Sequence, residues 1–376
     1  MIRVLTFGRF ADANFGGLER YVFELARGLR GVVDYTNIVA DRGGAPDVEV
    51  VGRTLRAPSW FELGGTPVCP GMLRLAHEAH RAAPFDIVHL QFPADPMAHW
   101  AAAIPRSAKR VISWHSDIIR QRTLLSLYRP FLNRLLRSAD AIIAATPAHF
   151  SSSEQLDPVR SRGIFHVVPY GLDLERFRAR PALADDLCAR YPAPFRIFSL
   201  GRHVYYKGFE FLIRALAAMP GTRLLLGGQG PLTEELKRTA RDAGVADRVA
   251  FLGRIPDAEL PAYYHACDVF CLSSIEPAEA FGIVQIEAMA AGRPVVCCEL
   301  HNGVNWVNRD GVTGLVVPPK DSAALAAALN RLAGDAALRG RLGTQARERA
   351  WREFTTEAMA QGTLRVYEQV LGKGKR

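Results

Sequence analysis

Short apolar runs of strand length alternate with amphipathic stretches of helix length along almost the whole chain. Runs such as Ile2–Phe7 and Ile87–Leu90 are rich in Val, Ile and Leu, and helical patterns such as Glu19–Leu29 lie between them. The rhythm starts again at Arg196–Leu200 and continues to Thr313–Val317. Apolar strands separated by helices are typical of parallel sheets that are covered on both faces. The pattern predicts an α/β protein with two Rossmann-like domains, whose ligands bind outside the carboxyl ends of the strands.

Gly and Pro mark the boundary between the two domains. The segment Pro169–Asp173 is followed by a polar, Pro-containing stretch that runs to Pro194, and such punctuation is typical of a linker. We therefore expect an N-terminal domain over residues 1–172 and a C-terminal domain over residues 173–355, facing each other across a cleft that holds the ligand. A last helical pattern over residues 356–371 is expected to pack back on the first domain.

Composition and cysteine spacing exclude several classes of protein. The 376 residues are 49% hydrophobic and 23% charged, which excludes a fibrous or disordered chain. The six cysteines form no C-x-x-C pair, so we expect free thiols in a reducing compartment rather than a zinc ribbon or a disulfide scaffold. The first residues do not form a secretory signal, and no apolar run is long enough to cross a membrane. We therefore expect a cytoplasmic protein.

The segment 276–290 combines two glutamates with the start of an apolar helix. It follows an expected strand, so Glu279 would lie in the loop at the strand end and Glu287 in the helix. The first N–H groups of a helix have no intrahelical partner and can bind a diphosphate, while the glutamates would accept hydrogen bonds from sugar and ribose hydroxyls. The alternative is that both glutamates are solvated charges near a helix start. The amides expected to bind the anion are those of Phe281, Gly282 and Ile283.

A second segment, residues 200–208, carries two cations between an expected strand and helix. Arg202 and Lys207 share this loop with Gly201 and Gly208, which allow a ligand to approach the backbone closely. A guanidinium and an ammonium in one loop suit a diphosphate leaving group. The spacing is not that of a P-loop, and the alternative is two solvated loop cations.

Three other strand ends give weaker signals. Gly16 and Gly17 follow the first strand but lack the G-x-G-x-x-G spacing of a dinucleotide site, and a glycine pair is often only a turn. His115 follows an expected strand that ends at Trp114, where a histidine is either structural or projects into the ligand site. Gly228 belongs to a glycine-rich loop after another strand, where a nucleotide would lie close to the backbone.

Together these positions resemble the signature set of the retaining glycosyltransferases of family four, which have the GT-B fold. That family includes bacterial mannosyl- and glucosyltransferases of lipopolysaccharide, O-antigen, exopolysaccharide and phosphatidylinositol mannoside assembly. The resemblance implies an N-terminal acceptor domain and a C-terminal domain that binds a nucleotide-sugar donor. The matching positions are Gly16-Gly17-x-Glu19, His115, Gly201-Arg202-x-Val204-x-x-Lys207-Gly208, and Glu279 and Glu287 with seven residues between them.

The resemblance implies a role for each matching residue. Arg202 and Lys207 would neutralise the diphosphate as the glycosidic bond breaks, an interaction that strengthens in the transition state. Glu287 would hold the ribose, and Glu279 would orient the donor sugar. His115 would hydrogen-bond that sugar or stabilise positive charge near the anomeric carbon. The other donor contacts would be Gly16 and Gly17 at the phosphates, Gly201, Gly228, Phe281, Gly282 and Ile283 through backbone groups, and Arg254 near the base.

No metal and no other cofactor is implied by the resemblance. The chain has no Asp-x-Asp motif, so a divalent cation has no obvious ligands. Retention would follow from attack on the same face of the sugar, with the leaving diphosphate taking the acceptor's proton.

The segment 106–137 is strongly basic and carries a leucine-rich face. It holds eight of the Lys and Arg residues against the single acid Asp117, in a chain whose net charge is +9. Such a charge suits nucleic acid, an anionic membrane or phosphate-bearing substrates. No nucleic-acid motif accompanies it, so we expect no nucleic-acid partner. The segment is interpreted either as peripheral contact with the cytoplasmic face of the inner membrane or as an ordinary helix whose leucines are core.

These observations favour a retaining, metal-independent glycosyltransferase that moves a hexose to a lipid-linked or cell-surface glycan. The expected donor is GDP-mannose, or otherwise a UDP-sugar that carries glucose or another hexose. Two alternatives stay open: a sugar-nucleotide 2-epimerase of the same shape, and a non-catalytic sugar-nucleotide-binding partner of another transferase.

Overall fold

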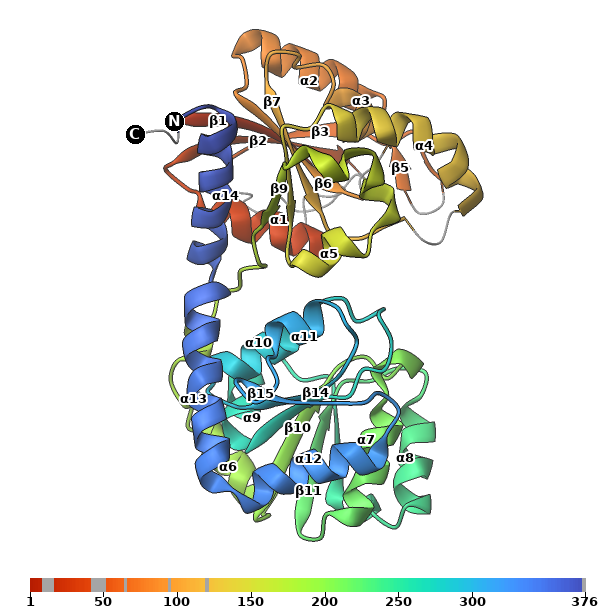
Figure 1. The fold of residues 1–376 in the computed structure, drawn as a ribbon, viewed down its shortest axis with the longest axis vertical. Helices are drawn as coiled ribbons and strands as arrows, with labels where there is room; N and C mark the ends of the chain where they lie inside the picture. Colours follow the sequence, from red (N-terminus) through yellow and green to blue (C-terminus); the bar gives the residue numbers. More distant parts are fainter. Residues whose placement is uncertain (9–16, 42–51, 64–65, 94–95, 119–121, 374–376) are drawn as a thin grey trace. The chain divides into compact units, whose positions relative to one another are not determined.

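A computed structural model describes the chain except for residues 9–16, 42–51, 64–65, 94–95, 119–121 and 374–376. The chain forms two compact units (Figure 1). The N-terminal unit contains Met1–Leu172 together with Thr355–Arg376, and the C-terminal unit contains Asp173–Phe354. The chain therefore crosses between the units twice.

The N-terminal unit is built on a parallel sheet of seven strands in the order β3-β2-β1-β6-β7-β8-β9. The order reverses between β1 and β6, so the loops that follow these two strands diverge. A short antiparallel pair, β4 (Phe61–Leu63) with β5 (Thr66–Val68), lies outside this sheet. The strands of the sheet are β1 (Ile2–Gly8), β2 (Val33–Asp41), β3 (Arg53–Pro58), β6 (Ile87–Phe92), β7 (Lys109–Trp114), β8 (Ala141–Ala144) and β9 (Phe165–Val167).

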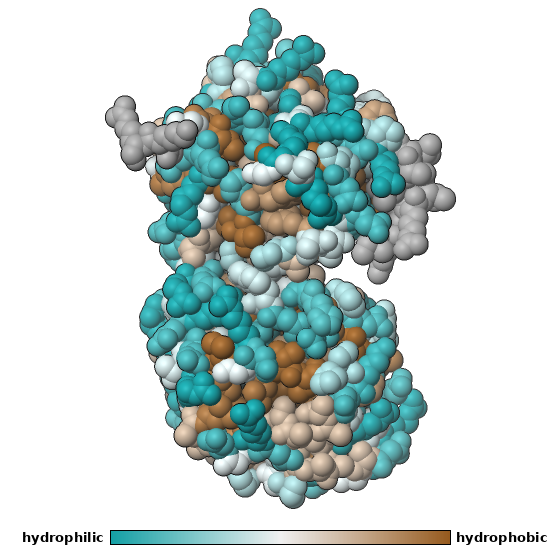
Figure 2. Space-filling model, viewed as in Figure 1, coloured by the Kyte–Doolittle hydropathy of each residue, from teal (hydrophilic) through white to brown (hydrophobic). Residues whose placement is uncertain are grey.

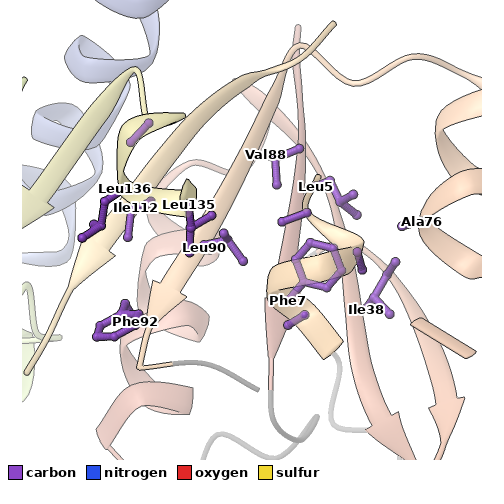
Figure 3. Packing of buried hydrophobic residues seen from close by; sticks show 14 of the residues in the cluster. Leu5, Phe7, Ile38, Ala76, Val88, Leu90, Phe92, Ile112, Leu135 and Leu136 are labelled. Carbon is purple, nitrogen blue, oxygen red and sulfur yellow. The ribbon is translucent and has the colours of Figure 1, made fainter. Parts of the chain in front are cut away.

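Successive side chains of these strands pack on opposite faces of the sheet, which gives the N-terminal unit two cores. Leu5 and Phe7 of β1 belong to one core, whereas Ile2 and Val4 belong to the other. Figure 3 shows the first core, with residues from several strands gathered against helical residues such as Leu135. The helices on this face are α2 (Gly71–Ala82), α3 (Pro96–Ala101) and α4 (Arg122–Arg137), and α1 (Gly17–Gly28) and α14 (Thr356–Val370) cover the other face.

Helix α14 carries the end of the chain back to the N-terminal unit. Tyr367 is fully buried, and its hydroxyl forms hydrogen bonds with Tyr35 (3.0 Å) and His89 (2.6 Å). A Cβ on Gly28 of α1 would lie 2.8 Å from the Cβ of Ala360, so the two helices pack closely at this glycine. The last helix is therefore an integral part of the first unit.

The C-terminal unit has a parallel sheet of six strands in the order β12-β11-β10-β13-β14-β15. The order reverses between β10 and β13, so the loops after these strands diverge at the middle of the sheet. The strands are β10 (Phe195–Leu200), β11 (Thr222–Gly227), β12 (Val249–Gly253), β13 (Val269–Leu272), β14 (Val295–Cys298) and β15 (Gly314–Val317). The helices are α6 (Leu183–Arg190), α7 (Phe209–Ala215), α8 (Thr233–Asp242), α9 (Leu260–Ala266), α10 (Ile283–Ala290), α11 (Gly303–Val307), α12 (Ser322–Gly334) and α13 (Ala336–Glu353).

The two parallel sheets confirm the α/β fold class that the sequence predicts. Strand β3 was not expected, because its sequence Arg-Thr-Leu-Arg-Ala-Pro is polar. It is an edge strand that forms by pairing with β2 alone. Charges and a proline are tolerated at such an edge, because one side of the strand has no neighbouring strand. Figure 2 shows mostly hydrophilic residues on the visible face of each unit. In the described part of the chain, no helix is both long and apolar enough to span a bilayer.

Candidate active site

The centre of the candidate site is an ion pair between Lys207 and Glu279. Lys207 ends a short 3-10 turn after β10, and Glu279 lies in the loop after β13, so both follow strands that adjoin the reversal in strand order. The Nζ atom of Lys207 donates to Oε2 of Glu279, and the two side chains are only 11% and 13% exposed. The low exposure limits screening by water and strengthens the attraction between these opposite charges.

Backbone contacts hold these two loops together. The Oγ of Ser273 donates to the Lys207 carbonyl at 2.9 Å, and the N–H of Ile275 donates to the Tyr206 carbonyl at 2.8 Å. Gly208 has a φ of +60°, and a Cβ there would lie 2.4 Å from the Ser273 carbonyl oxygen. A glycine is therefore needed for the loop of Lys207 to approach the loop of Glu279.

Glu279 is fixed by two further partners. Its Oε2 accepts a second hydrogen bond from Ser274 Oγ at 3.0 Å. Its backbone carbonyl accepts a hydrogen bond from Asn302 Nδ2 at 2.8 Å, which links the loop after β14 to this site. No described residue donates a hydrogen bond to its Oε1 atom, which is therefore available to a ligand hydroxyl.

The loops after β10, β11 and β12 form a platform of close backbone contacts. Gly201 N–H donates to the Gly227 carbonyl at 3.1 Å, and Gly228 N–H donates to the Gly253 carbonyl at 2.7 Å. A Cβ on Gly228, whose φ is +106°, would lie 1.9 Å from the Gly201 carbonyl oxygen. Arg202 and Arg254 extend from this platform and are exposed, and neither forms an ion pair with the described residues. Two guanidinium groups thus remain able to bind an anion.

Helix α10 begins next to the Glu279 loop. Gly282 precedes its first residue, Ile283, and has a φ of +69° and a ψ of 61°. Phe281 is buried, and its carbonyl accepts a hydrogen bond from Gln285 Nε2 at 2.8 Å. Gln285 N–H donates to the Gly282 carbonyl at 2.9 Å, so the N–H groups of Ile283 and Val284 are the ones that precede the first hydrogen bond of the helix. The loop after β13 leads to them.

Glu287 lies deeper in the C-terminal unit and is only 5% exposed. The Tyr264 hydroxyl donates to its Oε2 at 2.8 Å, and Arg176 Nη2 donates to its Oε1 at 3.3 Å. Burial, followed by the negative charge of Glu287, raises the pKa of Tyr264 well above its ordinary value, so this hydroxyl keeps its proton. The alternative interpretation of Glu287 as a solvated surface charge is therefore wrong. No motif or spacing pointed to Arg176 or Tyr264 as its partners.

In the N-terminal unit, His115 follows β7 and is held on several sides. Its Nδ1 is hydrogen-bonded to the Tyr170 hydroxyl and its Nε2 to Gln91 Oε1, both at 2.9 Å. The Tyr21 ring packs edge-on against the imidazole with 4.8 Å between centroids. Burial lowers the pKa of His115 from 6.5 to about 3, with smaller contributions from His89 and His149. His115 is therefore a neutral hydrogen-bonding group at physiological pH.

The other glycine signal falls at the start of α1. Gly17 is the first residue of this helix, and Gly16 lies outside the described residues. Gln91 is a neighbour of His115 that the sequence analysis missed, although it lies near the carboxyl end of β6 and so carries the same positional signal as His115. Within the described ranges, no cluster of three or more His, Cys, Asp or Glu residues has the arrangement of a metal site.

The fold and these strand-end loops define the chain as a GT-B glycosyltransferase. Residues 15–176 match the family model described as Glycosyltransferase Family 4, and residues 189–349 match the one described as Glycosyl transferases group 1. A structure of Anabaena Alr3699/HepE in complex with UDP matches with a TM-score of 0.79 at 21% identity, over 98% of this chain and 100% of that chain. The likeness at this level of identity is one of fold.

Curated relatives establish the family. The chain is 30% identical over 363 residues to the O-antigen chain mannosyltransferase C of Escherichia coli, with 95% of both chains covered. It is 32% identical over 337 residues to the D-rhamnosyltransferase WbpZ of Pseudomonas aeruginosa, over 88% of this chain and 86% of the relative. The chain belongs to the group 1, family 4 glycosyltransferases.

Proposed function

We propose that this glycosyltransferase moves a hexose from a nucleotide-sugar to a lipid-linked or cell-surface glycan, with retention of the anomeric configuration and without a metal. The proposed donor is GDP-mannose, or otherwise a UDP-sugar that carries glucose or another hexose. The observation that carries the proposal is the Lys207–Glu279 pair at the reversal in strand order. The relatives support the choice of mannose and of a surface glycan, because one is named as an O-antigen chain mannosyltransferase.

The cations of the C-terminal unit would bind the diphosphate of the donor. Lys207 uses one N–H on Glu279, which leaves two for phosphate oxygens, and exposed Arg202 adds a bidentate donor. Both charges act on the negative charge that grows on the leaving group as the bond to C1 breaks. Glu279 would keep the ammonium in place and accept a sugar hydroxyl on Oε1. Glu287 would accept the ribose hydroxyls while Tyr264 and Arg176 fix its orientation.

The N-terminal unit would supply the acceptor side and the uncharged contacts. In this proposal, the amides of Gly16 and Gly17 approach the phosphates, and neutral His115 contacts the donor sugar. The acceptor hydroxyl attacks C1 from the face that the diphosphate leaves. The bond from C1 to the phosphate oxygen breaks, the bond from C1 to the acceptor oxygen forms, and a phosphate oxygen takes the acceptor proton.

Selective binding tests the donor part of the proposal. Binding to the native state raises the unfolding temperature, so we expect stabilisation by GDP-mannose or by a UDP-sugar when a panel of GDP-, UDP- and ADP-sugars is compared. Transfer to the acceptor should continue in excess EDTA, and NMR of the product should show the anomeric configuration of the donor. Release of the nucleotide with a rearranged free sugar and no acceptor would instead indicate an epimerase, and binding without turnover would indicate a non-catalytic partner.

We further propose that helix α4 touches an anionic membrane surface. Leu132, Leu135 and Leu136 are buried in the core, so the leucine stripe of this part of the helix faces the sheet, as the ordinary-helix interpretation holds. The exposed face of α4 carries cations and Phe131, which lies beside Trp100 of α3, and such a surface suits anionic lipid headgroups. The rings of Trp100 and Phe131 are 6.2 Å apart, and these residues are 47% and 54% exposed. The exposed cations of the described part of this helix are Arg129, Arg134 and Arg137.

Sedimentation with vesicles tests this contact. The double variant Arg129→Glu/Arg134→Glu should bind vesicles that contain anionic phospholipid at least about 30-fold more weakly than the wild type, because each cation near such a surface contributes about 1 kcal/mol. The matched control is Arg238→Glu/Arg241→Glu, which changes two exposed arginines of helix α8 in the C-terminal unit. Equal loss in both double variants would show that only net charge matters, and no loss in the first would remove α4 from the contact.

A further inference from the structure

We infer that Tyr170 is a further residue of the sugar-binding site. Its hydroxyl is hydrogen-bonded to His115 until a sugar hydroxyl of the donor takes its place. This inference rests on the proposed contact between His115 and the donor sugar. It starts from the number of hydrogen bonds that the ring can make. A neutral imidazole has one donor nitrogen and one acceptor nitrogen, and here both have protein partners. A sugar hydroxyl can therefore reach a ring nitrogen only by displacing one of them.

The partner at Nε2 fixes which nitrogen accepts. The amide oxygen of Gln91 accepts from Nε2, so Nε2 carries the proton and Nδ1 has the free lone pair. The Tyr170 hydroxyl accordingly donates to Nδ1. Because the pKa of His115 is lowered to about 3 by burial, the ring keeps this acceptor at neutral pH. A sugar hydroxyl can donate to Nδ1 in the same way as the tyrosine does.

Gln91 is the partner that stays. It lies in the central strand β6 and is only 2% exposed. An amide displaced from such a place would be left without a partner, at the full cost of its desolvation. The bond to Nε2 is therefore retained, and with it the tautomer of the ring.

Tyr170 is the partner that can exchange. The residue keeps some exposed surface, but burial raises the pKa of its hydroxyl, so the displaced hydroxyl takes the incoming sugar as its new partner. The backbone beside it is held independently of the side chain. Gly171 N–H donates to Met359 Sδ at 3.2 Å, and the Leu172 carbonyl accepts from Thr356 N–H at 3.1 Å. The exchange thus requires movement of one side chain and leaves the connection between the units unchanged.

The variant Tyr170→Phe tests the exchange, because it removes the hydroxyl and keeps the ring that stacks on His115. Isothermal titration should show tighter binding of the nucleotide-sugar, by about threefold to tenfold, since no protein hydrogen bond must be broken first. The affinity for the matching nucleoside diphosphate without sugar should equal that of the wild type. Tyr191→Phe, in the C-terminal unit and outside the site, is the matched control and should leave both affinities unchanged.

Other results separate the failures. Weaker or equal nucleotide-sugar binding in Tyr170→Phe would overturn the inference, and equal weakening for both ligands would show a structural role. In Gln91→Met the tautomer is no longer fixed, and we expect the opposite sign, a weaker nucleotide-sugar complex. The affinity for the nucleotide-sugar minus that for the nucleoside diphosphate measures the contribution of the sugar. If this difference is the same in His115→Ala as in the wild type, His115 does not contact the sugar and its proposed role is wrong. The hydrogen bond between Tyr170 and His115 can be tested without any ligand. The ¹⁵N chemical shift of His115 Nδ1 should change in Tyr170→Phe, because that variant removes the hydroxyl.

Discussion

The two units place different chemistry at the carboxyl ends of similar parallel sheets. In the C-terminal unit, these ends carry the Lys207–Glu279 ion pair and the exposed guanidinium group of Arg202. In the N-terminal unit, the described strand ends carry His115, which is neutral and bonded to two uncharged partners. The same architecture thus carries a cation paired with a carboxylate in one half and a neutral histidine in the other.

The difference would suit the two parts of the nucleotide-sugar in the proposed function. A diphosphate needs cations, and these act most strongly where water is partly excluded. A sugar needs oriented donors and acceptors, and a charged histidine would lose its acceptor nitrogen. Burial therefore has opposite effects in the two units: it strengthens an ion pair in one and removes the charge of a histidine in the other.

The largest expected effect concerns the charged site. Lys207→Ala should lower kcat by about 1,000-fold, because a cation that acts on transition-state charge contributes a few kcal/mol. Steady-state kinetics at saturating donor would measure it. Lys237→Ala is the control, since Lys237 pairs with Glu234 in helix α8 and both are exposed. A kcat near that of the wild type in Lys207→Ala would show that Lys207 does not act on the charge of the leaving diphosphate.

The next effect concerns the N-terminal unit and the change of its stability in acid. Burial lowers the pKa of His89 from 6.5 to about 3 and that of His99 to about 4. Between pH 6.5 and these values the unfolded chain binds protons that the folded unit does not, so stability falls as pH falls. At pH 5 each histidine should cost the N-terminal unit about 2 kcal/mol relative to pH 7. Calorimetric unfolding at the two pH values would measure the loss.

His99→Phe sharpens this prediction. Both ring nitrogens of His99 lack a hydrogen-bond partner among the described residues, and the ring stacks between Phe92 and Tyr128. A phenyl ring should therefore fit and abolish about a third of the acid-dependent loss that His89, His99 and His115 cause together, since burial lowers the pKa of all three. The control His301→Gln changes a histidine of the C-terminal unit whose side chain is 81% exposed, and should leave the pH dependence unchanged. An unaltered pH profile in His99→Phe would assign the acid sensitivity to other groups.

A smaller effect is expected at Glu287. Glu287→Gln should raise the KM for the donor about tenfold with a lesser change in kcat, because an amide accepts weaker hydrogen bonds from ribose hydroxyls and from Arg176 than a carboxylate does. Initial rates over a range of donor concentrations would separate the two constants. A fall in kcat alone would place Glu287 at the reacting centre rather than at the ribose.

The smallest effect tests that stability and activity are separate in the C-terminal unit. Gly340 lies within helix α13, and a Cβ there would meet no atom within 4 Å. Gly340→Ala should stabilise this unit by up to about 1 kcal/mol without changing kcat. Thermal unfolding would measure the gain, and a loss of stability would indicate that the helix end is not as open as described.

The sequence alone predicted most of the sheet strands and several of the residues that gather at their ends. Strands such as Val269–Leu272 were predicted within a residue or two because apolar runs between helices are a local signal. The same signal led to Lys207 and Glu279, since each follows a strand. It did not lead to β3 (Arg53–Pro58), whose polar sequence forms a strand only through its pairing with β2.

Residue types and their order along the chain determined that this protein has two α/β halves and where its reactive side chains can gather. Only the tertiary structure decided who their partners are. Lys207 meets Glu279 across 72 residues, His115 meets Tyr170 across 55, and Glu287 meets Arg176 across 111. Periodicity reflects backbone geometry over a few residues, whereas such pairs, and the loss of charge on a buried histidine, depend on packing that sums over the whole unit.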